Sequence, residues 1–141
     1  MTTTIPIVLN KDSMTISREM DVVPFRSRVK ENAVKIGMSL VNQTKLITGA
    51  SELVRNMLKY AKGGVVKIEV LSKGRDTGIR LTFEDKGPGI PDINKAMQDG
   101  FTTGKSMGLG LPGTRRLMNE FNIQSEVGVG TVVTVTKWKN G

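Results

Sequence analysis

A short loop with one carboxylate and two glycines is the first feature of this sequence that could bind a ligand. Asp85 directly follows a strand-like alternating pattern, and Gly87 and Gly89 come just after it. Glycine lets a ligand ring approach the backbone closely, and a carboxylate at a strand end can accept a hydrogen bond from an amino group. The alternative is an ordinary loop in which Asp85 forms an Asx turn.

Residues 104–111, with the sequence GKSMGLGL, could bind phosphate. The segment leads into a predicted helix, and the free N–H groups and dipole of a helix N-terminus attract anions. A flexible loop followed by a capped helix, with Lys105 as a solvated charge, explains the same residues without a ligand. The run GVGT at residues 128–131 indicates a hairpin turn when it is taken alone.

Glu52 and Asn56 are spaced four residues apart in a segment of helical hydrophobic spacing. Side chains at this spacing lie on one helix face. Such a pair is common on the solvated side of a helix, and that is its simplest interpretation. The apolar residues beside both positions, however, place the pair at the margin of the buried face, where it can line a cleft.

Two segments of the sequence resemble well-known phosphate-binding motifs but do not meet their requirements. Residues 100–106 are one residue short of the P-loop consensus and follow a polar segment instead of a buried strand. Residues 108–113 spell G-x-G-x-x-G, but no strand precedes them and no acidic residue lies about 20 residues further on. The sequence therefore argues against a P-loop and against a dinucleotide fold.

Composition narrows the chemistry further. The chain has 141 residues with no cysteine and no histidine, which excludes disulfides, thiol or Ser-His-Asp catalysis and a phosphohistidine within it. Any metal must be bound through oxygen. The length predicts a single domain over residues 1–141. The sequence has neither a signal-peptide pattern nor an apolar run of about 18 residues, so we expect a cytoplasmic protein without a membrane span.

A net charge of +8 suits an anionic ligand or an acidic protein partner as well as nucleic acid. Because lysine and arginine are scattered and aromatic residues make up only 4% of the chain, we expect no nucleic-acid partner.

The hydrophobic pattern predicts which elements position these residues. Helical spacing predicts helices from Asp21 to Gly37 and from Ser39 to Gly63, the second with an inner face that starts at Leu40. Period-two alternation predicts strands at 65–70, 79–84, 123–127 and 131–137, and an opening hairpin with strands 4–9 and 14–17 around Asn10-Lys-Asp. Short helices are expected at 92–98 and 109–119. The predicted fold is an α/β two-layer sandwich, with a mixed, mostly antiparallel sheet and helices on one face.

Taken together, these pieces resemble the N, G1 and G2 boxes and the final G-T of the Bergerat-fold ATPases, the superfamily of gyrase, Hsp90, sensor histidine kinases and MutL. Within it the chain is similar to the anti-sigma-factor kinase group, and most of all to the serine/threonine switch kinases of the stressosome. The likeness covers nearly the whole chain, and the runs that carry it are SELVRN (51–56), EDKGPGIPD (84–92), DGFTT (99–103), GLGLPG (108–113), RLMNEF (116–121) and TKW (136–138).

The resemblance implies a role for each site residue. Asn56 would ligate Mg²⁺ at the nucleotide phosphates, and Glu52 would be the catalytic base. Asp85 would accept a hydrogen bond from the adenine amino group, with help from Gly89 and Thr131 through water. Residues 102–106 would form a short lid, poorer in glycine than is usual in the family, in which Lys105 could touch a terminal phosphate. The nucleotide-binding set is Asn56, Asp85, Gly87, Gly89, Thr103, Gly104, Lys105, Ser106, Met107, Gly108, Leu109, Gly110, Leu111 and Thr131.

The resemblance also implies an activity, which is Mg-ATP-dependent phosphorylation of a serine or threonine on a STAS-domain protein. That partner would sequester the kinase until it is phosphorylated, and the freed kinase would bind and activate a PP2C-type phosphatase. The alternative is a non-catalytic module or anti-sigma factor, in which ATP only gates binding. Arg115 and Arg116 are either docking residues or solvated helix charges.

Overall fold

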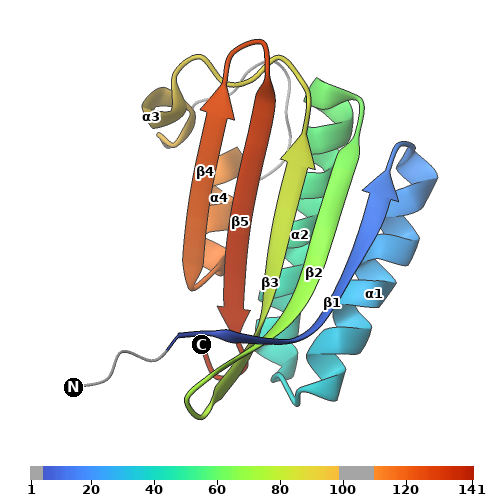
Figure 1. Ribbon diagram of the computed structural model, residues 1–141, viewed down its shortest axis with the longest axis vertical. Helices are drawn as coiled ribbons and strands as arrows, with labels where there is room; N and C mark the ends of the chain where they lie inside the picture. The colour runs from blue at the N-terminus through green and yellow to red at the C-terminus, as the bar shows by residue number, and fades with distance from the viewer. Residues whose placement is uncertain (1–4, 99–109) are drawn as a thin grey trace.

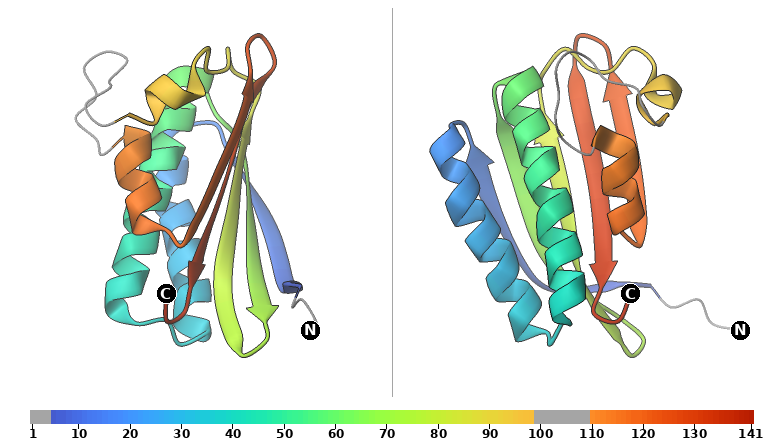
Figure 2. Two further views of the ribbon diagram at one scale, coloured as in Figure 1. Left: turned by 90° about the vertical axis from the view of Figure 1, so that its left-hand side faces the viewer. Right: turned by 180° about the vertical axis from the view of Figure 1, so that it is seen from behind.

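Five strands form one sheet in the order β1-β2-β3-β5-β4 in the computed structural model, which describes residues 5–98 and 110–141. All four pairings of this sheet are antiparallel. Helices α1, α2 and α4 cover one face of the sheet, and the other face is left open (Figures 1 and 2). The expected α/β two-layer sandwich is therefore confirmed, without a parallel strand pair in the described sheet. In chain order the elements are β1 (Ile7–Ile16), a 3-10 turn (Glu19–Asp21), α1 (Val22–Lys35), α2 (Leu40–Ala61), β2 (Gly64–Lys73), β3 (Asp76–Asp85), α3 (Ile93–Ala96), α4 (Gly110–Leu117), β4 (Glu120–Glu126) and β5 (Gly130–Trp138).

The predicted opening hairpin is wrong, because residues 7–16 form a single edge strand. Its polar stretch does not turn back, since Asn10, Lys11 and Asp12 pair in extended conformation with β2. The strand has an irregularity between Val8 and Asn10, where its register against β2 shifts. Asp12 pairs with Arg28 of α1, and this ion pair lowers the pKa of Asp12. A turn-forming composition was thus overridden by pairing with a neighbouring strand and helix.

The two long helices begin and end close to where their capping residues predict. Gly37 has a φ of +79° just after α1, and its N–H donates to the carbonyl of Val34. Ser39 caps α2 by accepting a hydrogen bond from the Asn42 N–H at 3.2 Å. Asp21 differs from the expectation, since its carboxylate turns back to the N–H groups of Ser17 and Arg18 and does not cap α1.

The core lies between the sheet and the helices. On α1, Phe25 and Val29 are fully buried, as their helical spacing predicts. On α2, Leu40 lies outside the inward face to which it was assigned, since it is 74% exposed while Leu46 is buried. The rings of Phe25 and Phe83 meet edge to face, with centroids 6.0 Å apart, and join α1 to the middle of the sheet.

No helix within the described ranges, 5–98 and 110–141, combines the length and hydrophobicity that crossing a bilayer needs.

Replacing Phe25 by alanine should lower the free energy of unfolding by about 3–5 kcal/mol, because the truncation leaves a cavity at a fully buried position and removes the contact with Phe83. Urea denaturation measures the loss. Val23→Ala, on the exposed side of the same helix, is the control and should change stability by less than about 1 kcal/mol. A small effect of Phe25→Ala would contradict the packing of α1 against the sheet.

Candidate active site

Three side chains form a row across one end of the sheet, on neighbouring strands. Asp85, the last residue of β3, pairs with Thr131 near the start of β5, and Thr131 pairs in turn with Ser125 near the end of β4. Opposite residues in an antiparallel pair point to the same face of the sheet. The row therefore faces the helix layer, as the buried neighbours Phe83 and Val133 do.

The Asp85 carboxylate is held by the backbone through one oxygen only. Its Oδ1 accepts hydrogen bonds from the N–H of Gly87 at 2.9 Å and from the N–H of Thr131 at 3.2 Å. The first bond is the Asx turn that the sequence left open as an alternative. Within the described residues, Oδ2 receives no hydrogen bond. The carboxylate is thus fixed in place with one oxygen left to accept from a ligand amino group.

The two glycines of the loop are required by close packing within the protein. A Cβ on Gly87 would lie 2.6 Å from the Cβ of Ala61, at the end of α2. Gly89 has a φ of +79°, and a Cβ there would lie 2.4 Å from the carbonyl oxygen of Glu126. Glycine at these positions lets the loop lie against α2 and the β4–β5 hairpin. The loop is therefore clamped between a helix and a strand end, which keeps the site in shape.

Ser125 is a site residue that the sequence analysis did not find. Its hydroxyl accepts from the N–H of Ile90 at 2.7 Å, at the exit of the Asp85 loop. It also lies 2.8 Å from the Thr131 hydroxyl and 3.2 Å from the carbonyl oxygen of Gly130. The available signal was its place on the inward side of the alternating β4 pattern, opposite Thr131.

Glu52 and Asn56 lie on the side of α2 that faces α4. Gly49, on the same helix, packs against Met118 and Thr114 so closely that a Cβ on it would lie 2.4 Å from the Met118 side chain. At 100° per residue, positions 52 and 56 lie within about 60° of position 49 around the helix. Both are half-buried, as expected for the margin of the core. Along α2 the pair lies between Gly49, which packs against α4, and Ala61, which lies against Gly87 of the Asp85 loop.

Glu52 and Asn56 form no strong hydrogen bond or ion pair with the described residues. The Glu52 carboxylate is 13% exposed, and its recorded partner is Arg55, 3.8 Å away on the same helix. The Arg55 side chain is 52% exposed and the two groups are too far apart for a hydrogen bond, so this ion pair contributes little to stability. No hydrogen bond to the Asn56 amide occurs within residues 5–98 and 110–141. Both groups are therefore available to a ligand.

The predicted phosphate segment is only partly described. Gly110 and Leu111 open α4, whose start points toward the end of the sheet that carries Asp85 (Figure 2). Thr103, Gly104, Lys105, Ser106, Met107, Gly108 and Leu109 lie outside the described residues, as does the expected lid. The described turns of α4 contain no acidic residue, so no carboxylate of this helix competes for an anion at its start. Arg115 and Arg116 lie in its last turn, where positive charge suits the helix dipole.

The donor set fits Mg-ATP. A purine amino group has an acceptor in Asp85, and the start of α4 offers N–H groups to phosphate. Among the described residues, no cluster of three or more acidic, histidine or cysteine side chains could hold a metal ion. A magnesium ion at Asn56 would therefore take most of its ligands from phosphate oxygens and water, which is how this ion commonly binds with nucleotides.

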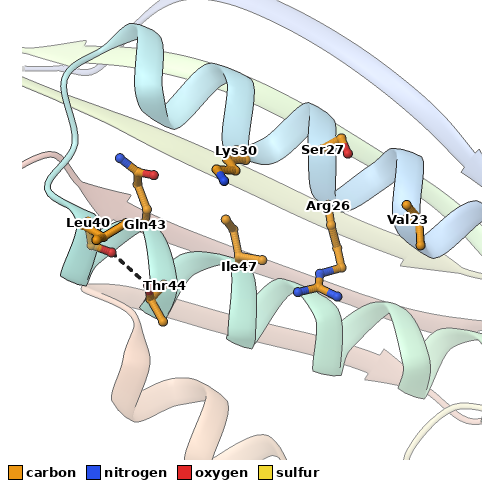
Figure 3. A pocket seen from close by; sticks show the side chains of 8 residues that line it. All are labelled: Val23, Arg26, Ser27, Lys30, Leu40, Gln43, Thr44 and Ile47. Carbon is orange, nitrogen blue, oxygen red and sulfur yellow. Dashed lines mark hydrogen bonds between the residues drawn. The ribbon is translucent and has the colours of Figure 1, made fainter.

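A separate hollow of about 290 Å³ lies between α1 and α2, away from the Asp85 row. Figure 3 shows its walls, with side chains from both helices. Arg26 and Lys30 of α1 contribute positive charge, and no carboxylate pairs with either of them in the described parts of the chain. The lining residues are Val23, Arg26, Ser27, Lys30, Leu40, Gln43, Thr44 and Ile47.

The fold and the site together define a class of protein. Residues 41–140 match the family described as histidine kinase-, DNA gyrase B- and HSP90-like ATPases, and the chain belongs to this family. The expected Bergerat fold and the use of ATP are thereby confirmed.

Within the family, the chain is 40% identical over 129 residues to "Serine/threonine-protein kinase RsbT" of Bacillus subtilis. The aligned region covers 92% of this chain and 97% of that protein. It is 36% identical over 101 residues to "Anti-sigma F factor" of Geobacillus stearothermophilus, which covers 67% of this chain and 68% of that protein. These similarities support the expected protein serine/threonine kinase.

The fold recurs in a crystal structure of the RsbU and RsbW domains of a Mycobacterium tuberculosis protein. The TM-score is 0.65 at 19% identity, over 91% of this chain and 32% of that one. At this identity the likeness concerns the fold alone.

Asp85→Asn should weaken ATP binding by about 1.5–3 kcal/mol, roughly tenfold or more in affinity. Asparagine keeps an oxygen for the N–H groups of Gly87 and Thr131 but would turn an N–H₂ donor toward an adenine amino group bound there. Calorimetry with Mg-ADP measures the loss, and Asp76→Asn, at the exposed opposite end of β3, is the control. Equal affinity of wild type and Asp85→Asn would remove Asp85 from the nucleotide site.

Proposed function

We propose that this chain is an Mg-ATP-dependent serine/threonine kinase that phosphorylates a STAS-domain protein in a cytoplasmic partner switch. Released from that partner, it binds and activates a PP2C-type phosphatase. The observation that carries the proposal is the Asp85 row, in which one carboxylate oxygen receives no hydrogen bond from any described residue, at the same end of the molecule as Glu52 and Asn56. The similarity to RsbT over 92% of this chain supports the choice of a kinase over other ATPases.

Mg-ATP supplies the phosphoryl group, and the metal neutralises phosphate charge. The chain's own residues would hold the nucleotide at both ends. Asp85 would accept from the adenine amino group beside Thr131. Asn56 would present its amide oxygen to the metal. The N–H groups of residues 107–111 would bind the phosphates, and of these residues Gly110 and Leu111 open α4.

Glu52 is the proposed base. As the serine hydroxyl oxygen of the partner bonds to the γ-phosphorus, the bond from that phosphorus to the bridging oxygen breaks, and the hydroxyl proton passes to the Glu52 carboxylate. The half-buried position one turn before Asn56 keeps this carboxylate next to the metal ligand. The neighbouring Arg55, 3.8 Å away, is too exposed to hold it strongly.

The groove between α1 and α2 is a candidate contact surface for the STAS-domain partner. Its cations Arg26 and Lys30 line the same hollow as apolar side chains such as Leu40, which is 74% exposed. Charge of this kind attracts an acidic surface and chiefly raises the rate of association. The net charge of +8 acts in the same direction.

A second candidate function is favoured by the 36% identity to an anti-sigma F factor. In that case nucleotide sets the conformation that binds a sigma factor or a phosphatase, without phosphate transfer being required. The two candidates differ in what they require of Glu52.

Glu52→Gln should reduce phosphate transfer by roughly a hundredfold or more, because the amide cannot take the hydroxyl proton. ATP affinity should stay within about threefold of wild type, since the proposed nucleotide contacts are retained. Intact mass of the STAS-domain protein measures transfer, and calorimetry measures binding. Glu31→Gln, on the exposed side of α1, is the matched control. Full transfer by Glu52→Gln would remove the proposed base, and signalling without any transfer would favour the binding module.

Arg26→Glu should weaken binding of the STAS-domain protein, most strongly at low ionic strength, while Mg-ADP affinity stays unchanged. Surface plasmon resonance at two salt concentrations measures both association and dissociation rates. Arg75→Glu makes the same charge change at the exposed β2–β3 turn and serves as the control. Equal effects of the two variants would show that only net charge matters, and would exclude the groove as the contact.

A further inference from the structure

Lys137 is a buried lysine that the proposed kinase site does not use. It lies on β5 opposite Ile79 of β3, in the same inward-facing series as Val133 and Val135. The residue is only 3% exposed. Lysine is almost never buried to this extent unless its charge is paired. A positive charge therefore occupies a position where the alternating pattern of β5 favours an apolar side chain.

The ammonium group of Lys137 has no acceptor within residues 5–98 and 110–141. No hydrogen bond joins it to these residues, and none of their four ion pairs includes it or Lys45 of α2. Burial lowers the pKa of Lys137, and the positive charge of Lys45 lowers this pKa further. Two neighbouring cations without a counter-ion repel each other, and an anion between them would turn this repulsion into attraction.

The fold brings Lys45 to Lys137 from the helix layer. Lys45 lies one turn before Gly49 and within about 40° of it around α2, on the side that packs against the end of α4. The side-chain amide of Asn42 donates to the carbonyl oxygen of Lys139 at 3.2 Å, which ties the start of α2 to the end of β5. Figure 2 shows these two ends side by side. One ammonium group thus comes from a helix and the other from the strand beneath it.

This pair of lysines is separate from the Asp85 row. Lys137 stands six positions after Thr131 on β5, which corresponds to about 20 Å along an extended strand. Thr131 is the residue that pairs with Asp85. The two lysines therefore lie toward the other end of the sheet from the proposed nucleotide site.

We propose that Lys45 and Lys137 bind one oxyanion between their ammonium groups. Both groups are donors only, so their ligand must be an acceptor, and a charged oxygen forms the strongest hydrogen bonds with them. Because Lys137 is shielded from water, its attraction for an anion exceeds that of an exposed lysine. A free inorganic ion and an acidic side chain of a bound protein both supply this chemistry. The inference does not depend on the proposed function.

Nuclear magnetic resonance titrations of the isotope-labelled chain test the proposal. The probes are sodium sulfate, for a free ion, and the amide of N-acetylglutamate, for a protein side chain. Sodium chloride keeps the ionic strength constant, and Mg-ADP is present to occupy the proposed nucleotide site. We expect saturable shifts of the amide signals of Lys45, Ile79 and Lys137, with a dissociation constant of roughly 1–10 mM for at least one probe. The probe that binds more tightly identifies the source of the oxyanion.

Lys137→Met should raise that dissociation constant tenfold or more, because it removes one charged hydrogen bond while methionine still fills the buried space. Lys73→Met makes the same charge change at an exposed position near the β2–β3 turn and is the control. Equal titrations of wild type and Lys137→Met would overturn the proposal. The absence of saturable shifts in wild type with both probes would also overturn it.

Thermal unfolding gives a second readout. An ion that binds the folded state stabilises it, whereas the general effect of sulfate on proteins acts on all variants alike. Sodium sulfate should therefore raise the midpoint of wild type and of Lys73→Met by more than that of Lys137→Met. Equal increases in all three would contradict a bound oxyanion. If Lys137→Met does not fold, Lys45→Met carries both comparisons, because its position is exposed.

Discussion

One carboxylate oxygen fixes the geometry of the proposed nucleotide-binding end of this molecule. Oδ1 of Asp85 accepts from the backbone of its own loop, at Gly87, and from the backbone of the neighbouring strand, at Thr131. The two bonds fix where β3 ends and how the loop leaves it. They also use up one oxygen only, so the same residue that shapes the loop still has an acceptor for a ligand. Because one oxygen of Asp85 holds the loop and the other can accept from a ligand, the geometry of the site depends on this single side chain.

Helix α2 carries the proposed catalytic base and metal ligand, Glu52 and Asn56. Small residues let α2 approach its neighbours, with Gly49 against Met118 of α4 and Ala61 against Gly87 of the loop. Glu52 and Asn56 lie between these two contacts along α2, on the side of the helix that faces α4. The proposed metal binding by Asn56 and the proposed proton acceptance by Glu52 therefore both depend on the packing of α2.

Most of the helices and strands, and many of the buried positions, could be predicted from the sequence. Phe25 and Val29 repeat at helical spacing, and Val66 and Ile68 alternate, because burial on one face leaves a periodic trace. Strand pairing leaves no such trace. The sequence therefore predicts a turn at Asn10, which is in fact extended and paired with β2, and an inward position for Leu40, which is exposed. The contacts of Ser125 could not be predicted for a related reason. Only the strand register, which the sequence does not give, brings this serine opposite Thr131.

A crystal structure with magnesium and a non-hydrolysable ATP analogue tests the central claim most directly. The account predicts the adenine amino nitrogen within hydrogen-bonding distance of Oδ2 of Asp85, the metal at the Asn56 amide oxygen and the phosphates at the start of α4. A nucleotide bound with its adenine away from Asp85, or seated in the groove between α1 and α2, would contradict the account.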